Sequence, residues 1–146
     1  MCGIAGIVDF TSSELQINEK ILSDMSDVMY HRGPDSDGQW ISPDNKCGFA
    51  FRRLAIIDLS PAGNQPMMSN DMRYVVVFNG EIYNHKELRS ELEQKGYKYR
   101  SNTDTETILN GYAEWGDKIL DKMIGMWGLA IWDNEKKELF ASRDRI

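Results

Sequence analysis

Apolar positions in the first half of the chain change between strand-like and helix-like spacing. A nearly continuous apolar run predicts a buried strand over residues 3–10. Apolar residues at helical spacing predict a helix over residues 19–30, with Asn18 as its N-cap. The Gly-Pro pair within residues 31–35 ends this helix in a loop. Short strands are then expected before the turn-rich segment 60–66, over residues 38–41, 48–51 and 54–59.

The strongest strand pattern is the valine-rich run over residues 74–78. It leads directly into Asn79 and Gly80, a dipeptide that is typical of a tight turn. A helix follows, with Asn84 as its predicted cap and Gly96 in the left-handed position after its end.

The last third of the chain begins with a capping box. Residues 103–106 read Thr-x-x-Glu and predict a helix that ends at Gly116. A short helical turn is expected over 119–123, and two antiparallel strands over 126–132 and 138–142. Strands and helices are mixed and no repeat or linker divides the chain, so the sequence predicts one α+β domain with antiparallel pairing.

Composition and charge narrow the function classes. A chain of 146 residues with 41% hydrophobic residues can bury a core. The net charge of −6 and the lack of clustered Lys and Arg argue against a nucleic-acid partner. No apolar run is long enough to span a membrane and no signal segment is present, so we expect no membrane partner and a cytoplasmic protein. The cysteines and histidines have no metal-ligand spacing, so no metal is expected.

Cys2 is the most unusual candidate because of its position. Removal of Met1 would make it N-terminal, and an N-terminal cysteine carries its own base, an α-amine with a pKa of about 8. The alternative is a buried structural cysteine, which describes most cysteines in proteins.

Other polar residues fit an amino-acid substrate. The side-chain amide of Asn79 and the backbone N–H of Gly80 are the parts of an oxyanion hole. Arg53 could pair with a carboxylate, and Glu81 and Asp104 with an ammonium group. The alternatives are a surface charge for Arg53, an edge-strand residue for Glu81 and a helix cap for Asp104.

Five ordered motifs carry a resemblance to a known family. They are Met1 to Ile4, His31 to Asp35, Arg53 to Asp58, Asn79 to Asn84, and Asp104 to Glu106. Over residues 1–146 the chain resembles the glutaminase domain of asparagine synthetase-type class II glutamine amidotransferases. Sister families of the hexosephosphate and purine pathways carry different residues in the 31–35 loop.

The resemblance implies a fold and a reaction. The fold is that of the N-terminal-nucleophile (Ntn) hydrolases, an αββα sandwich in which two antiparallel sheets stack between layers of helices. Cys2 is implied to attack the side-chain amide of glutamine, forming a thioester and releasing ammonia. Asn79 and Gly80 are implied to hold the oxyanion. His31 is not assigned as a general base, because the family uses the α-amine.

The resemblance also implies how glutamine binds. Arg53 would bind its carboxylate, and Glu81 and Asp104 its ammonium group. Four further residues would line the pocket through their backbone: Leu54, Ala55, Ile56 and Ile57. Cys47 has no implied role and is expected in the core. The domain itself would need no cofactor.

Residues 143–146 resemble the opening of a family motif that normally continues into further strands. We therefore expect a glutaminase domain that is incomplete at its C-terminus and lacks its partner, the synthetase domain that uses ATP and Mg²⁺. No phosphate-binding glycine loop occurs in the chain. Two alternatives remain: a catalytically silent fragment that retains Met1, and an amidotransferase for another acceptor such as a sugar acid. The oligomeric state, including a homodimer, stays open.

Overall fold

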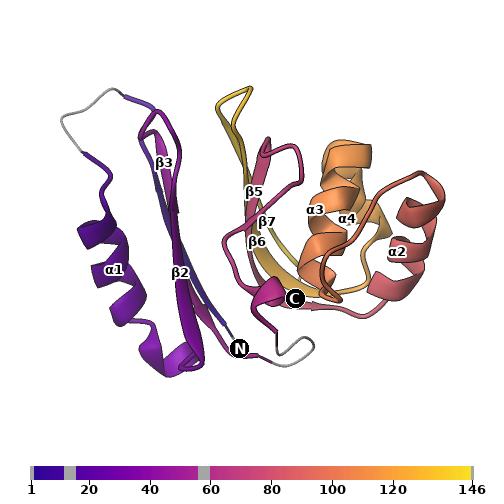
Figure 1. Ribbon diagram of the computed structural model, residues 1–146, viewed down its shortest axis with the longest axis horizontal. Coiled ribbons are helices and arrows are strands. Elements are labelled where there is room, and N and C mark those ends of the chain that lie inside the picture. Colours follow the sequence, from indigo (N-terminus) through magenta and orange to yellow (C-terminus); the bar gives the residue numbers. More distant parts are fainter. Residues whose placement is uncertain (1, 12–15, 56–59, 146) are drawn as a thin grey trace.

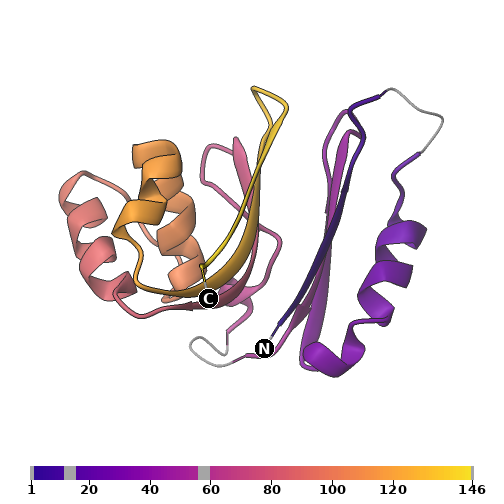
Figure 2. The same cartoon turned by 180° about the vertical axis from the view of Figure 1, so that it is seen from behind.

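The fold consists of two antiparallel sheets stacked between helices (Figure 1). The computed structural model describes residues 2–11, 16–55 and 60–145. Helix α1 lies outside one sheet, and α2, α3 and α4 lie outside the other, as the view from behind also shows (Figure 2). This order of layers confirms the predicted α+β class.

The first sheet has three strands in the order β1-β3-β2. They span Gly3–Val8 (β1), Ser36–Ile41 (β2) and Cys47–Arg53 (β3). Helix α1, Glu19–Asp27, begins where the Asn18 side chain accepts a hydrogen bond from the Ile21 N–H at 3.1 Å, which confirms the predicted N-cap. It ends earlier than predicted, and the short 3₁₀ turn η1, Tyr30–Arg32, follows.

The second sheet has four strands in the order β4-β5-β6-β7. They span Met67–Met68 (β4), Tyr74–Ile82 (β5), Gly125–Asp133 (β6) and Glu138–Arg143 (β7). Its outer face is covered by α2 (His85–Gln94), α3 (Asp104–Trp115) and α4 (Ile119–Lys122). Two 3₁₀ turns connect elements: η2, Pro61–Gly63, precedes β4, and η3, Gly116–Lys118, lies between α3 and α4.

Alternation along β5 divides the core in two. Val75 and Val77 pack with Phe49 of β3 between the sheets, whereas Val76 and Phe78 pack with the helices. All five side chains are at most 3% exposed. Burying a side chain of this kind contributes roughly 1.5 to 3 kcal/mol, so β5 stabilises both halves of the molecule.

Several expectations at turns and caps require correction. Asn79 and Gly80 form no tight turn, because they lie inside β5 opposite Gly128 and Trp127 of β6. Asn84 makes no side-chain cap for α2; its amide instead bonds the backbone of α4 and the residues after it. The strand β4 was not expected, and most of the strand predicted over 54–59 lies outside the described residues.

The other predicted ends agree with the structure. Gly96 has a φ of +98° just after α2, and Gly116 has a φ of +61° after α3. Thr103 accepts a hydrogen bond from the Glu106 N–H at 3.2 Å, as its capping role requires. The Glu106 carboxylate, however, binds the N–H groups of Arg100 and Ser101.

Candidate active site

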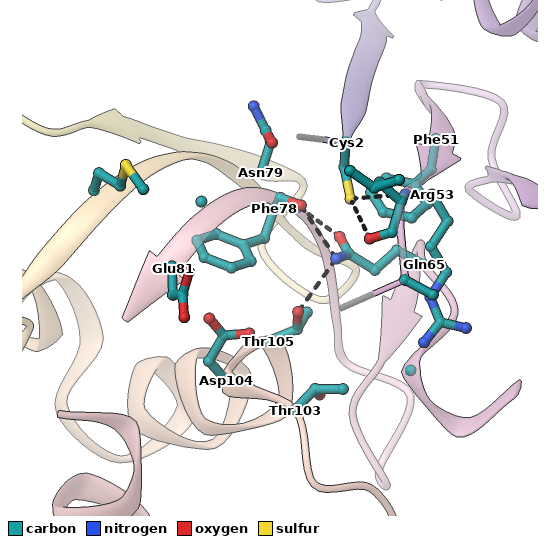
Figure 3. Close-up of a pocket in the computed structure, with 15 residues that line it drawn as sticks. Cys2, Phe51, Arg53, Gln65, Phe78, Asn79, Glu81, Thr103, Asp104 and Thr105 are labelled. Atoms are coloured by element: carbon teal, nitrogen blue, oxygen red, sulfur yellow. Dashed lines mark hydrogen bonds between the residues drawn. The ribbon is translucent and has the colours of Figure 1, made fainter. Parts of the chain in front are cut away.

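The predicted site residues meet in one cavity of about 110 Å³ at the edge of the two sheets (Figure 3). The cavity is lined by eight of them: Cys2, Arg53, Leu54, Ala55, Asn79, Gly80, Glu81 and Asp104. The predicted residues Ile56 and Ile57 lie outside the described part of the chain. Groups separated by a hundred positions in sequence thus face one space.

Cys2 lies directly before β1, and its thiol contacts the backbone of Leu54. The Sγ atom is 3.3 Å from the Leu54 nitrogen, which donates to it, and 3.6 Å from the Leu54 oxygen. The carbonyl oxygen of Cys2 accepts a hydrogen bond from Arg32 Nε at 3.4 Å. These contacts hold the thiol at the cavity wall. Cys47, in contrast, is fully buried, as predicted for a core cysteine.

The 31–35 loop supports this wall from behind. Gly33 lies so close to the backbone of Arg52 and Arg53 that a Cβ atom there would be 2.6 Å from both carbonyl carbons. The carboxylate of Asp35 accepts a hydrogen bond from the Ala55 N–H at 2.8 Å. The loop therefore fixes the end of β3 and the start of the segment that contacts Cys2.

Arg53 is the last residue of β3, and its guanidinium group is held by the segment around η2. One of its nitrogens donates to the Ser60 carbonyl at 2.9 Å and to Asn64 Oδ1 at 2.8 Å. Gly63 lies against the same group, where a Cβ would overlap the guanidinium. Only 7% of Arg53 is exposed, so its charge is placed at the cavity rather than in solvent.

The N–H groups along one edge of β5 form the opposite wall. Phe78 N–H donates to Gln65 Oε1 at 2.6 Å, and Ile82 N–H donates to Asp104 Oδ2 at 3.1 Å. Because every second N–H of a strand points to the same side, Gly80 N–H lies on this edge between them. The residue opposite Gly80 in β6 is Trp127, and both its N–H and its carbonyl oxygen bond Asp144. Gly80 and Trp127 therefore form a strand pair without mutual hydrogen bonds.

Asp104 is the first residue of α3 and is only 5% exposed. Burial raises the pKa of its carboxyl group, and the nearby Glu81 carboxylate acts in the same direction. The Ile82 N–H and His85 act against this rise. Figure 3 shows both carboxyl groups at the same end of the cavity. A cation between them would favour the ionised form of Asp104.

Sequence reasoning missed two polar residues of the cavity wall. Gln65 and Thr105 line the cavity, and their side chains bond each other at 3.2 Å. Gln65 was included only in a turn-rich segment and Thr105 only in a capping box. No periodic pattern could have identified them, because their contacts depend on where β4 ends.

The described residues contain no metal-binding cluster and no membrane-spanning helix. No group of three or more His, Cys, Asp or Glu side chains among them could hold a metal ion. No helix in this part of the chain combines the length and apolar character needed to cross a membrane.

Comparisons with known proteins match the chain along its length. A model of the glutamine amidotransferase domain matches residues 1–146. Asparagine synthetase [glutamine-hydrolyzing] 1 of Bacillus subtilis is 40% identical over 99% of this chain and 22% of its own length. Asparagine synthetase B [glutamine-hydrolyzing] of Escherichia coli is 38% identical over 100% of this chain and 26% of its own. The chain thus spans about a quarter of these relatives or less.

A solved structure supports the fold. Glutamine phosphoribosylpyrophosphate amidotransferase from B. subtilis matches with a TM-score of 0.56 and 19% identity, over 68% of this chain and 23% of its own. This likeness supports the Ntn-hydrolase architecture that the stacked antiparallel sheets display. From the full-length match to the family model and the similarity to the asparagine synthetases, the chain belongs to the glutamine amidotransferase domain family.

Proposed function

We propose that this chain is a glutaminase domain that hydrolyses the side-chain amide of glutamine to glutamate and ammonia. The observation that carries the proposal is the single cavity that Cys2, Arg53, Asp104 and the N–H edge of β5 share. A nucleophile, a cation, carboxylates and a backbone donor are the groups that attack on an amino-acid amide requires.

Binding of glutamine uses charge complementarity across the cavity. Arg53 binds the α-carboxylate, because its guanidinium is already oriented by Ser60 and Asn64. Glu81 and Asp104 bind the α-ammonium group at the other end. The backbone of Leu54 and Ala55 lines the space between, and Ile56 and Ile57 are assigned to the same wall from the family motif alone.

The chemistry begins when the α-amine of Cys2, freed by removal of Met1, takes the proton of the thiol. The sulfur attacks the amide carbon, and the C=O electron pair moves to oxygen. The Asn79 side-chain NH₂ and Gly80 N–H hold that oxyanion. Collapse of the intermediate expels ammonia, which leaves with the proton from the amine. Water then attacks the thioester, which releases glutamate and restores the thiol.

The relatives support a proposal for the use of the ammonia. Those named asparagine synthetases are four to five times as long as this chain. We propose that ammonia passes to a synthetase domain that consumes ATP with Mg²⁺, in a cytoplasmic protein. Another acceptor, such as a sugar acid, is the alternative that such a domain would decide. Assembly as a homodimer is a separate proposal.

The proposal is tested by following glutamate release from glutamine with the chain, with Cys2→Ala and with Cys47→Ala. We expect Cys2→Ala to reduce the rate to background, and Cys47→Ala to retain turnover because that thiol is in the core. Turnover should fall as pH drops through the α-amine pKa, about 8 before any shift by the fold. Equal rates for the chain and Cys2→Ala would refute the proposal.

Intact mass separates this function from its alternative. A species lighter by one methionine is expected in active samples. A sample that retains Met1 has no free amine at Cys2 and should release no glutamate. This is the result expected for the alternative, a catalytically silent fragment.

A further inference from the structure

The short strand β4 ends just before the part of β5 that faces the cavity. Met68 pairs with Val75 and Met67 with Val76, so the same register would place Gln65 opposite Phe78. The strand β4 begins at Met67, and Pro66 lies between Met67 and Gln65. The backbone pairing therefore stops two residues before it would reach Phe78.

The side chain of Gln65 replaces the missing backbone pair. Its Oε1 accepts from the Phe78 N–H at 2.6 Å, and its Nε2 donates to the Phe78 carbonyl at 3.1 Å. In an antiparallel ladder, a directly opposed residue exchanges the same two bonds through its backbone. Nε2 also donates to Thr105 Oγ1 at 3.2 Å (Figure 3), which ties this arrangement to α3.

Gln65 is itself held firmly. It is only 7% exposed, and its carbonyl oxygen lies against Gly38 of β2, where a Cβ would overlap it. Asn64, the preceding residue, orients Arg53. One short segment thus contacts the first sheet with its backbone and the second sheet with the Gln65 amide.

These bonds bracket Gly80. Gln65 fixes the N–H of Phe78, two residues before Gly80, and Asp104 fixes the N–H of Ile82, two residues after it. Across this edge, no acceptor for the Gly80 N–H occurs among the hydrogen bonds of the described residues. The donor between the two anchors is directed into the cavity.

We propose that Gln65 is a positioning residue that aims the Gly80 N–H at the oxyanion through Phe78. This inference rests on the proposed glutaminase function. Because the oxyanion exists only during reaction, loss of the Gln65 bonds should reduce kcat and leave glutamine binding nearly unchanged. Misplacing a group by about 1 Å can reduce a rate roughly a hundredfold.

The test compares Gln65→Met with the matched control Gln94→Met, at the exposed end of α2. We expect Gln65→Met to lower kcat roughly ten- to a hundredfold and to change KM for glutamine less than about threefold. Gln94→Met should match the wild type in both constants. An unchanged kcat, or a rise in KM alone, would overturn the assignment.

Thr105 variants cover the case in which Gln65→Met fails to fold. Thr105→Val removes one acceptor from Gln65 Nε2 and keeps the side-chain volume, so a smaller loss confined to kcat is expected. Thr105→Ser keeps the hydroxyl and should restore kcat. If Val and Ser behave alike, the hydroxyl does not act through Gln65 and the proposal fails.

Amide hydrogen exchange separates this inference from the proposed function. If the wild type releases no more glutamate than Cys2→Ala, the glutaminase proposal fails. The hydrogen bond from the Phe78 N–H to Gln65 can still be measured by exchange. Gln65→Met should then speed exchange of the Phe78 amide roughly tenfold or more and leave Val76, paired with Met67, unchanged. Unchanged exchange at Phe78 would refute the anchor itself.

Discussion

The two sheets supply the cavity in different ways. The three-stranded sheet places its groups at strand ends, with Cys2 just before β1 and Arg53 as the last residue of β3. The four-stranded sheet supplies Asn79, Gly80 and Glu81 from inside β5. The first set depends on where strands end. The second set depends on the edge of β5 that continues beyond its pairing with β4.

This difference determines what each region tolerates. A side chain at a strand end can be adjusted by the loop that follows, as η2 does for Arg53. A donor inside a strand is fixed by the backbone of that strand and by its pairing with the adjacent strand, which at Gly80 is β6. Changes in β5 should therefore disturb fold and catalysis together, and changes at the end of β3 should disturb glutamine binding more than turnover.

The largest effect is expected from Gly80→Ala. A Cβ at this position would overlap the Met126 carbonyl oxygen and lie 2.7 Å from Trp127 Cα, so β5 and β6 would have to separate. Overpacking of this kind costs roughly 1 to 3 kcal/mol of folding free energy. Displacement of the Gly80 N–H should also lower kcat roughly a hundredfold or more. Denaturant unfolding and steady-state glutaminase assays measure the two effects.

Gly128→Ala is the matched control on the paired strand. Gly128 lies opposite Asn79, and the nearest atom to its added Cβ would be the Asn79 carbonyl oxygen at 4.0 Å. We expect a change in unfolding free energy of less than about 0.5 kcal/mol and no loss of kcat. Equal losses of unfolding free energy and kcat in both variants would show that the sheet tolerates an added Cβ poorly at either position, and would contradict a specific requirement for glycine at position 80.

The contrast also explains what the sequence could predict. The strand starting at Gly3 and the helix capped by Thr103 follow from local periodicity and capping chemistry, and both are present. The turn expected at Asn79 and Gly80 was wrong because pairing with β6 overrides the local preference of the dipeptide. Tertiary context decides such cases.

The site residues also divide into those that local sequence signals identify and those that depend on tertiary contacts. Cys2, Arg53 and Asp104 were identified as candidates from residue type, position and family motifs, and the structure brings them to one cavity. Gln65 could not be identified, because its function as a substitute for a backbone pair exists only once Phe78 lies opposite it. A polar residue in a turn-rich segment carries no signal of such a partner.

The next largest effect is expected from Arg53→Ala, in binding. Removing one partner of a buried charge pair costs roughly 2 to 5 kcal/mol, so the Kd for glutamine should rise about a hundredfold. Calorimetric titration of glutamine into the Cys2→Ala background measures this without turnover. In the active chain, kcat at saturation should fall far less than kcat/KM.

Arg52→Ala is the control, because adjacent strand residues face opposite sides. Arg52 points away from the cavity toward α1, donating to the Ser26 carbonyl at 3.1 Å and pairing with Asp27 at 2.5 Å. Its loss should leave the Kd for glutamine unchanged. A comparable loss of affinity in both variants would contradict the assignment of Arg53 as the carboxylate anchor.

The smallest effect is expected from Asp104→Asn, because Glu81 remains as a second carboxylate. The neutral amide can still accept from the Ile82 N–H, so the variant isolates the charge. Loss of one charged hydrogen bond should raise the Kd for glutamine roughly tenfold. In the wild type, affinity should improve as pH rises through the pKa of Asp104, which burial raises, and the variant should lack this component.

Stability should respond to pH in the opposite sense. Because the native state holds the Asp104 proton more tightly than the unfolded chain, this group favours folding below its unfolded pKa of about 3.9. That contribution is lost as pH rises through the raised native pKa. As pH rises above about 4, the Tm of the wild type should therefore fall relative to that of Asp104→Asn. A constant difference, with an unchanged pH profile for glutamine binding, would show that Asp104 is ionised throughout and that burial does not control its charge.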